Sequence, residues 1–95
     1  MIYFITQEYR YVKIGFTEDN PEAEMASMQP GNPFPLRLYK VVAGTKDKAR
    51  EIHSQFEGLK VCGEWFYLTA SLMEYIDGAD PVHNGLCNST WLLDV

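Results

Sequence analysis

Residues 2–16 read IYFITQEYRYVKIGF, and this stretch decides the fold. Its two ends, at 2–6 and 11–16, are rich in β-branched and aromatic residues, which favour strands. The polar run QEYR separates them at 7–10. Two such segments joined by a short polar connection are typical of a β-hairpin. The chain is therefore predicted to begin with two antiparallel strands.

A helix and a third strand are predicted after the hairpin. Asn20 can serve as the N-cap of a short helix that begins with Pro21 and carries acidic residues in its first turn. The segment PGNP at 30–33 should end that helix. Residues 36–42, LRLYKVV, alternate between apolar and polar and indicate a half-buried strand. A three-stranded antiparallel sheet is therefore expected at the centre of the fold.

Two further helices are predicted behind threonine caps. Thr45 can cap a helix over residues 46–57, with Gly58 available to end it. The apolar side chains of this helix share one face, which should pack on the sheet. Thr69 can cap a third, short helix that runs to Ile76. The predicted class is α+β, with a small three-stranded antiparallel sheet flanked by two to three helices.

Size and composition describe one globular domain. Ninety-five residues, 46% of them hydrophobic, can build a core. A chain this short nevertheless buries only about two-thirds of its unfolded surface. We expect the domain to occupy residues 1–77 and residues 78–95 to form a tail docked on it. Trp91-Leu92-Leu93 in this tail can pack on the core, add an edge strand or contact a partner, and the sequence leaves these alternatives open.

The charge balance disfavours generic binding to nucleic acid. Eight basic and thirteen acidic residues give a net charge of −5, which raises the cost of approaching a phosphate backbone. A local basic stripe remains an alternative if these side chains gather in space: Lys13, Arg37, Lys40, Lys46, Lys48 and Arg50. Two distant cysteines, no long apolar run and no basic, apolar leader predict a cytoplasmic protein that does not use a membrane.

An ordered series of short motifs runs along most of the chain. It consists of Tyr3, Lys13-Ile14-Gly15, Gly31-Asn32-Pro33, His53 and Gly63-Glu64-Trp65-Phe66. In this order the motifs resemble the GIY-YIG nuclease superfamily, and most closely its short bacterial and phage branch, where the second motif reads Lys-Ile-Gly. The resemblance covers roughly residues 1–76. It implies the same plan of a hairpin, a helix, a strand and a helix.

The resemblance also implies a chemistry, which is cleavage of phosphodiester bonds. In that family a tyrosine or a bound water is activated, an arginine steadies the phosphate and a glutamate holds one divalent cation. Charge that develops on the phosphate must be met by fixed cations or donors. If the chain is active, the resemblance makes Tyr3, Lys13, His53 and Glu64 the catalytic residues, with Mg²⁺ or Mn²⁺ as cofactor.

Two positions depart from the family pattern. Alignment on the Gly-Asn-Pro turn puts Glu24 where the family has its phosphate-binding arginine, so the charge is reversed. Alignment on His53 puts Ala49 where the metal-binding glutamate should stand, and a methyl group cannot coordinate magnesium. We therefore expect a catalytically degenerate member with no metal and no other cofactor. The alternative is that Arg37 or Arg50 supplies the guanidinium and Glu64 the carboxylate.

The function expected from these residues is binding to a basic protein surface. The candidate binding residues are Tyr3, Lys13, Glu22, Glu24, His53 and Trp65. Because the relatives by motif lie in phages and bacteria, we expect a phage or mobile-element protein that inhibits a host nucleic-acid-processing or defence complex. The alternatives are a metal-dependent endonuclease that cleaves DNA and a pocket that holds a small anionic ligand such as a nucleotide. The oligomeric state does not follow from the sequence.

Overall fold

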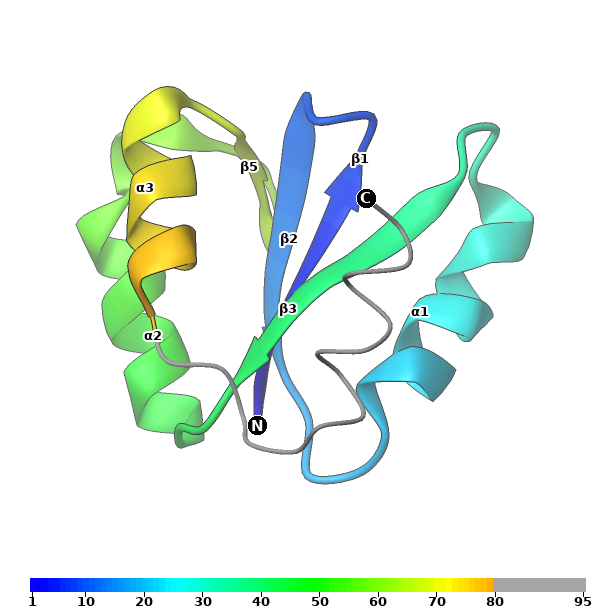
Figure 1. Cartoon of the computed structure of the whole chain (residues 1–95), viewed down its shortest axis with the longest axis horizontal. Helices are drawn as coiled ribbons and strands as arrows, with labels where there is room; N and C mark the ends of the chain where they lie inside the picture. The colour runs from blue at the N-terminus through cyan, green and yellow to red at the C-terminus, as the bar shows by residue number, and fades with distance from the viewer. Residues whose placement is uncertain (80–95) are drawn as a thin grey trace.

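A five-stranded antiparallel sheet forms the centre of the computed structural model, which describes residues 1–79 (Figure 1). Its strand order is β3-β1-β2-β5-β4. The strands are β1 (Ile2–Gln7), β2 (Tyr11–Phe16), β3 (Leu36–Val42), β4 (Lys60–Cys62) and β5 (Trp65–Tyr67). The α+β class is confirmed, whereas the expected number of three strands is wrong.

The additional strands are β4 and β5, which form a hairpin around Gly63 at φ +55°. Each has three residues, too few for an alternating pattern to be visible in the sequence. The pairing of β5 with β2 also joins segments about fifty residues apart, and no local propensity reports such a contact. The short strands therefore escaped prediction for reasons of length and sequence separation.

The predicted hairpin is present, and it fixes the register of the sheet centre. β1 pairs with β2 from Ile2 opposite Phe16 to Gln7 opposite Tyr11. The turn places Glu8 and Tyr9 at φ 52° and 57°, in the left-handed region. One consequence of this register is that Tyr3 lies directly opposite Gly15.

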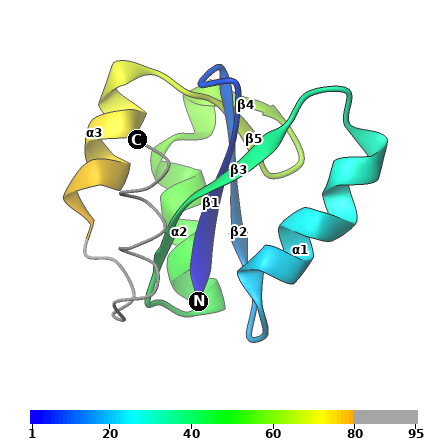
Figure 2. The ribbon, with the colours of Figure 1, turned by 45° about the vertical axis from the view of Figure 1, so that its right-hand side comes forward.

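Helices cover both faces of the sheet (Figures 1 and 2). α1 (Pro21–Met28) lies on one face, and α2 (Lys46–Gln55) and α3 (Ala70–Gly78) lie on the other. All three predicted N-caps are confirmed, because the side chains of Asn20, Thr45 and Thr69 accept hydrogen bonds from backbone amides at 2.9, 3.2 and 3.3 Å.

The predicted end of the second helix is wrong. α2 ends at Gln55 rather than at residue 57, and Phe56 leaves the helical conformation at φ −113°, ψ 25°. A 3₁₀ turn over Glu57–Leu59 follows and leads directly into β4. The helix stops early because the chain has to turn back to pair β4 with β5. Gly58 lies within that turn instead of capping the helix.

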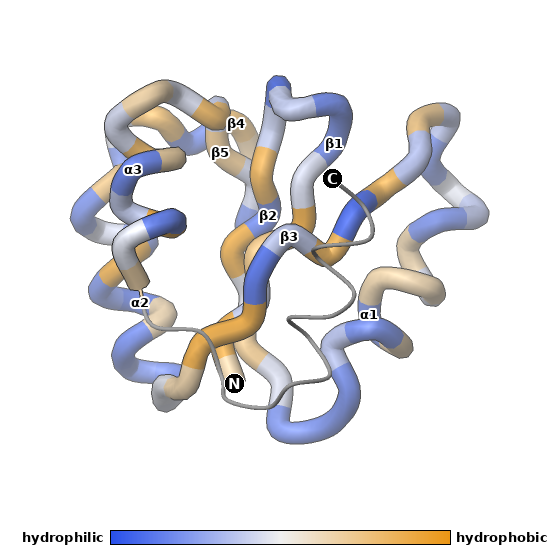
Figure 3. Tube along the Cα trace, viewed as in Figure 1, coloured by the Kyte–Doolittle hydropathy of each residue, from blue (hydrophilic) through white to orange (hydrophobic). Residues whose placement is uncertain are grey.

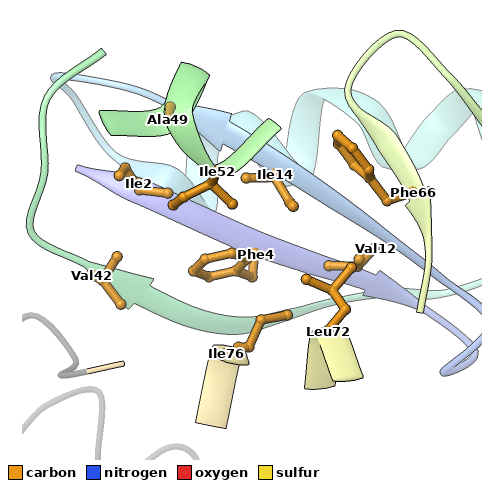
Figure 4. Close-up of a cluster of buried hydrophobic side chains, with 10 residues drawn as sticks. All are labelled: Ile2, Phe4, Val12, Ile14, Val42, Ala49, Ile52, Phe66, Leu72 and Ile76. Atoms are coloured by element: carbon orange, nitrogen blue, oxygen red, sulfur yellow. The ribbon is translucent and has the colours of Figure 1, made fainter. Parts of the chain in front are cut away.

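Each face of the sheet has its own apolar cluster, as the alternation of side chains along strands requires. The larger cluster, between the sheet and the α2–α3 layer, is shown in Figure 4 and contains Ile2, Phe4, Val12, Ile14, Val42, Ala49, Ile52, Phe66, Leu72 and Ile76. The smaller cluster, under α1, contains Tyr3, Ile5, Leu36 and Val41, with Met25, Met28 and Trp65 packed against it. Apolar residues accordingly concentrate on the central strands, whereas polar and apolar residues alternate along the helices (Figure 3).

β3 holds the last turn of α3. Lys40 Nζ donates to the carbonyls of Ile76 and Asp77 at 2.8 and 3.1 Å, and the Tyr39 hydroxyl donates to the Asp77 carboxylate. A lysine in this position satisfies carbonyls that have no partner within the helix. α3 thus extends through Gly78, and the alternatives for Trp91-Leu92-Leu93 lie outside the described residues. In the described part of the chain, a helix with the length and apolar character needed to span a membrane is absent.

Candidate functional site

A cleft of about 430 Å³ lies at the edge of β2, where β5 stops short. β1 pairs with β2 along its whole length, but β5 pairs only with Tyr11–Lys13, so the segment Ile14–Phe16 has no strand on its β5 side. Ile14 finds other partners. Its amide donates to the Glu64 carbonyl at 3.0 Å, and its carbonyl accepts from His53 Nε2 at 2.7 Å. The cleft therefore exists because one strand is shorter than its neighbour.

The two walls of the cleft carry opposite charges. α2 contributes Lys46, Ala49, Arg50 and His53, which follow the i, i+3, i+4, i+7 spacing of one helical face. The other wall consists of the loop after β2, with Glu18 and Asp19, and of Glu64 from the β4–β5 turn. The sequence spacing of Lys46, Arg50 and His53 was already sufficient to place them on one face of a helix.

Tyr3 does not line the cleft and belongs to the smaller cluster on the opposite face of the sheet, but it lies opposite Gly15, which does line the cleft. Its ring lies against Gly15, where a Cβ atom would overlap the ring and the hydroxyl group. Tyr3 is only 3% exposed. Burial, together with the smaller effects of the Glu64 and Glu24 carboxylates, raises the pKa of its phenol to about 12. The phenol therefore stays protonated at neutral pH.

Lys13 lies on the same face of the sheet as Tyr3 and has local partners. Its Nζ lies 3.6 Å from Glu64 Oε1 and 3.3 Å from Met28 Sδ. The Lys13 side chain is 20% exposed and that of Glu64 49% exposed. Trp65 lies opposite Lys13 in the sheet and packs against the smaller cluster. The charge of Lys13 is thus largely offset by Glu64.

His53 connects α2 to β2. Because a carbonyl can only accept, Nε2 carries the proton in its hydrogen bond to Ile14. The ring also packs edge-on against Phe66, with the centroids 5.0 Å apart. His53 is half-buried, so it both supports the cleft and lines it.

The structure gathers most of the predicted site residues around β2. Ala49, His53 and Glu64 line the cleft. Tyr3 on β1, Lys13 on β2 and Trp65 on β5 lie on the face of the sheet that α1 covers. Glu22 and Glu24 are exposed on α1.

The predicted alternative cations are divided between different places. Arg50 lines the cleft and lies 3.5 Å from Asp47 in an exposed ion pair, whereas Arg37 lies opposite Thr6 in the pairing of β1 with β3. Lys13 and Lys40 have internal partners. Within residues 1–79, no three His, Cys, Asp or Glu side chains are grouped so that they could hold a metal ion.

Comparisons with protein-family models, with curated proteins and with solved structures found no significant match.

Proposed function

We propose that this chain is a non-catalytic protein with a GIY-YIG-like fold, and that it binds a basic surface of a partner protein. The observation that carries the proposal is the charge around Tyr3. The two carboxylates that act on its phenol, those of Glu24 and Glu64, would repel a phosphate group. A cationic surface would be attracted to the same place.

The chemistry of the cleft supports a non-catalytic role. Ala49 places a methyl group where the resemblance would require the metal-binding carboxylate. The phenol of Tyr3, with its raised pKa, is almost entirely protonated at neutral pH, so very little phenolate is present to act as a base or nucleophile. Each lost electrostatic contact in a reaction of this kind costs on the order of 10²–10³ in rate, so the loss of two would leave little activity.

The acidic surface next to the cleft supports a basic partner. Glu18, Asp19, Glu22 and Glu24 are exposed on the loop after β2 and on α1. None of the four forms an ion pair with another residue of the 1–79 region. Unpaired carboxylates grouped on one side steer a positively charged partner and favour its binding. Proteins that process nucleic acid present such basic surfaces, so a phage or mobile-element inhibitor of a host nucleic-acid-processing or defence complex is the role we propose.

Affinity capture with matched charge variants tests this proposal. Glu22→Lys/Glu24→Lys reverses charge on α1, and Glu51→Lys/Glu74→Lys makes the same change in net charge at exposed positions on α2 and α3. We expect the wild type and the control variant to retain a lysine- and arginine-rich partner from a bacterial lysate. The α1 variant should bind at least about tenfold more weakly, and added salt should weaken the wild-type complex. Equal binding by the two variants would contradict the proposal.

A metal-dependent endonuclease is the second candidate, and one observation favours it. Arg50, His53 and Glu64 line the same cleft, so a guanidinium, an imidazole and a carboxylate are present together. Incubation with plasmid or single-stranded DNA and Mg²⁺ or Mn²⁺ separates the two functions. Metal-dependent cleavage that disappears in Tyr3→Phe would replace the binding proposal with the nuclease.

A further inference from the structure

Within residues 1–79, the Tyr3 hydroxyl has no hydrogen-bond partner, although the residue is almost completely buried. Tyr3 is 3% exposed, and no hydrogen bond joins its hydroxyl to any residue between 1 and 79. In the same region, every fully buried side-chain nitrogen or oxygen has a hydrogen-bond partner. The small exposed part of Tyr3 therefore includes its oxygen. This oxygen is available to a ligand while the rest of the side chain is fixed by packing.

The surroundings of this oxygen are set by the register of the hairpin and by α1. Tyr3 lies opposite Gly15, and Lys13 is two residues farther along on the same face. Met28 contacts Lys13 from α1. Glu24 lies one helical turn before Met28 on the same side of the helix, and its carboxylate is close enough to act on the Tyr3 phenol. Glu64 lies beside Lys13, with Oε1 3.6 Å from Lys13 Nζ, and its carboxylate also acts on the phenol.

The charges around the phenol sum to one negative unit. Glu24 and Glu64 contribute two negative charges, and Lys13 contributes one positive charge. A phosphate group would add to the negative charge, whereas a single cation would neutralise it. Both carboxylates and the phenol oxygen can accept hydrogen bonds. The surroundings of the phenol thus combine several hydrogen-bond acceptors with a net charge of −1, which one bound cation would neutralise.

We propose that Tyr3, Glu24 and Glu64 form a binding site for the guanidinium group of an arginine on the partner protein. The planar guanidinium has five donors in a fixed fork and can reach acceptors on two sides, whereas an ammonium group is a compact point charge. This inference rests on the proposed function and specifies the chemistry of its contact. In the resemblance to GIY-YIG nucleases, Tyr3 takes the place of the first-motif tyrosine, so the proposed site would bind a charge opposite to that of a phosphate.

A peptide titration followed by NMR tests the site without the natural partner. The probe is the blocked tripeptide acetyl-Gly-Arg-Gly-amide, added to the full-length ¹⁵N-labelled chain. We expect saturable shifts of the backbone amides of Gly15 and Glu64. The same peptide with citrulline, a neutral isostere of arginine, should produce no saturable shift, and the lysine peptide should bind more weakly.

Variants assign the effect to the proposed residues. Glu24→Gln and Tyr3→Phe should each weaken binding of the arginine peptide, Glu24→Gln by about tenfold because a charged acceptor is lost. Glu74→Gln, at an exposed position on α3, should bind as the wild type does. Glu24 is exposed on α1, so its variant is expected to fold even if the Tyr3 variant does not.

Several results would overturn the inference. The arginine peptide could cause no saturable shift at Gly15, or the citrulline or lysine peptide could bind as tightly as the arginine peptide. Glu24→Gln could bind the arginine peptide as tightly as the wild type does, or inorganic phosphate could cause the saturable shift at Gly15 instead. The result is independent of the capture experiment. If the peptide binds but capture of the partner does not depend on Glu22 and Glu24, the site is supported and the proposed function is contradicted. If capture depends on these two residues but the peptide does not bind, the proposed function is supported and the site is contradicted.

Discussion

At the scale of single residues, Gly15 is required by Tyr3. Any Cβ at position 15 would meet the Tyr3 ring, which is held by the smaller cluster and has little room to move. We predict that Gly15→Ala lowers the free energy of unfolding by about 1–3 kcal/mol, as overpacking of a filled core does. Urea denaturation measures the change. Gly31→Ala is the control, since a Cβ added at position 31 would have nothing within 4 Å, and an equal loss in both variants would refute the explanation.

The pKa of Tyr3 predicts a loss of stability at high pH. In the unfolded chain a tyrosine titrates near pH 10, and in the folded protein burial raises the pKa of Tyr3 to about 12. The stabilising contribution is therefore fully present below pH 10 and is lost as the pH rises toward 12, because only the unfolded state releases the proton in this range. It amounts to at most about 2–3 kcal/mol.

Comparison with Tyr3→Phe isolates this contribution. The pKa of Tyr39 is also raised to about 12, by burial and then by its hydrogen bond to Asp77, so the wild type has two tyrosines of this kind. Denaturation of both proteins between pH 8 and pH 12 should show a steeper decline in the wild type than in the variant. Parallel curves would show that Tyr3 titrates normally.

Single residues of the site were predictable only where one element contains them. The spacing of Ala49 and His53 follows from helical periodicity, and the strand position of Tyr3 from the hairpin. The proximity of Glu64 to Lys13 was not predictable, because the two side chains are about fifty residues apart in sequence. Their contact depends on the pairing of β5 with β2, which no local pattern reports.

At the scale of elements, the hydrogen bond from His53 joins α2 to the unpaired edge of β2. We predict that His53→Phe, which keeps a ring against Phe66 but leaves the buried Ile14 carbonyl without a donor, costs about 1–3 kcal/mol. Thermal unfolding measures this loss. His53→Gln, which retains an amide donor, should recover part of the stability. If both variants are equally unstable, ring packing and not the hydrogen bond connects the two elements.

Predictability also differed between kinds of element. Helix starts were predictable because a cap is a local contact between a side chain and an amide two or three residues away, as at Asn20, Thr45 and Thr69. The end of α2 depended on where the chain had to pair next, which is a property of the whole sheet. Local chemistry thus determined where helices begin, and tertiary pairing determined where α2 ends.

At the scale of the whole molecule, stability depends on one main core. A chain of this length is expected to have a free energy of unfolding of about 5–14 kcal/mol. Phe66 is completely buried on β5, next to Tyr67, which is 50% exposed. We predict that Phe66→Ala costs about 3–5 kcal/mol, whereas Tyr67→Ala costs about 1 kcal/mol or less. Calorimetric unfolding of both variants measures the difference, and similar losses would place the stabilising contacts of β5 outside the core.

The short length of β5 has a consequence for the evolution of such a chain. The room beside Ile14–Phe16 depends on how many residues precede Trp65 in extended conformation. Lengthening β5 by one or two residues at this end would let backbone amides and carbonyls occupy the space. Changes in the length of the β4–β5 turn can therefore widen, narrow or fill the cleft, while the two apolar clusters of the domain stay unchanged.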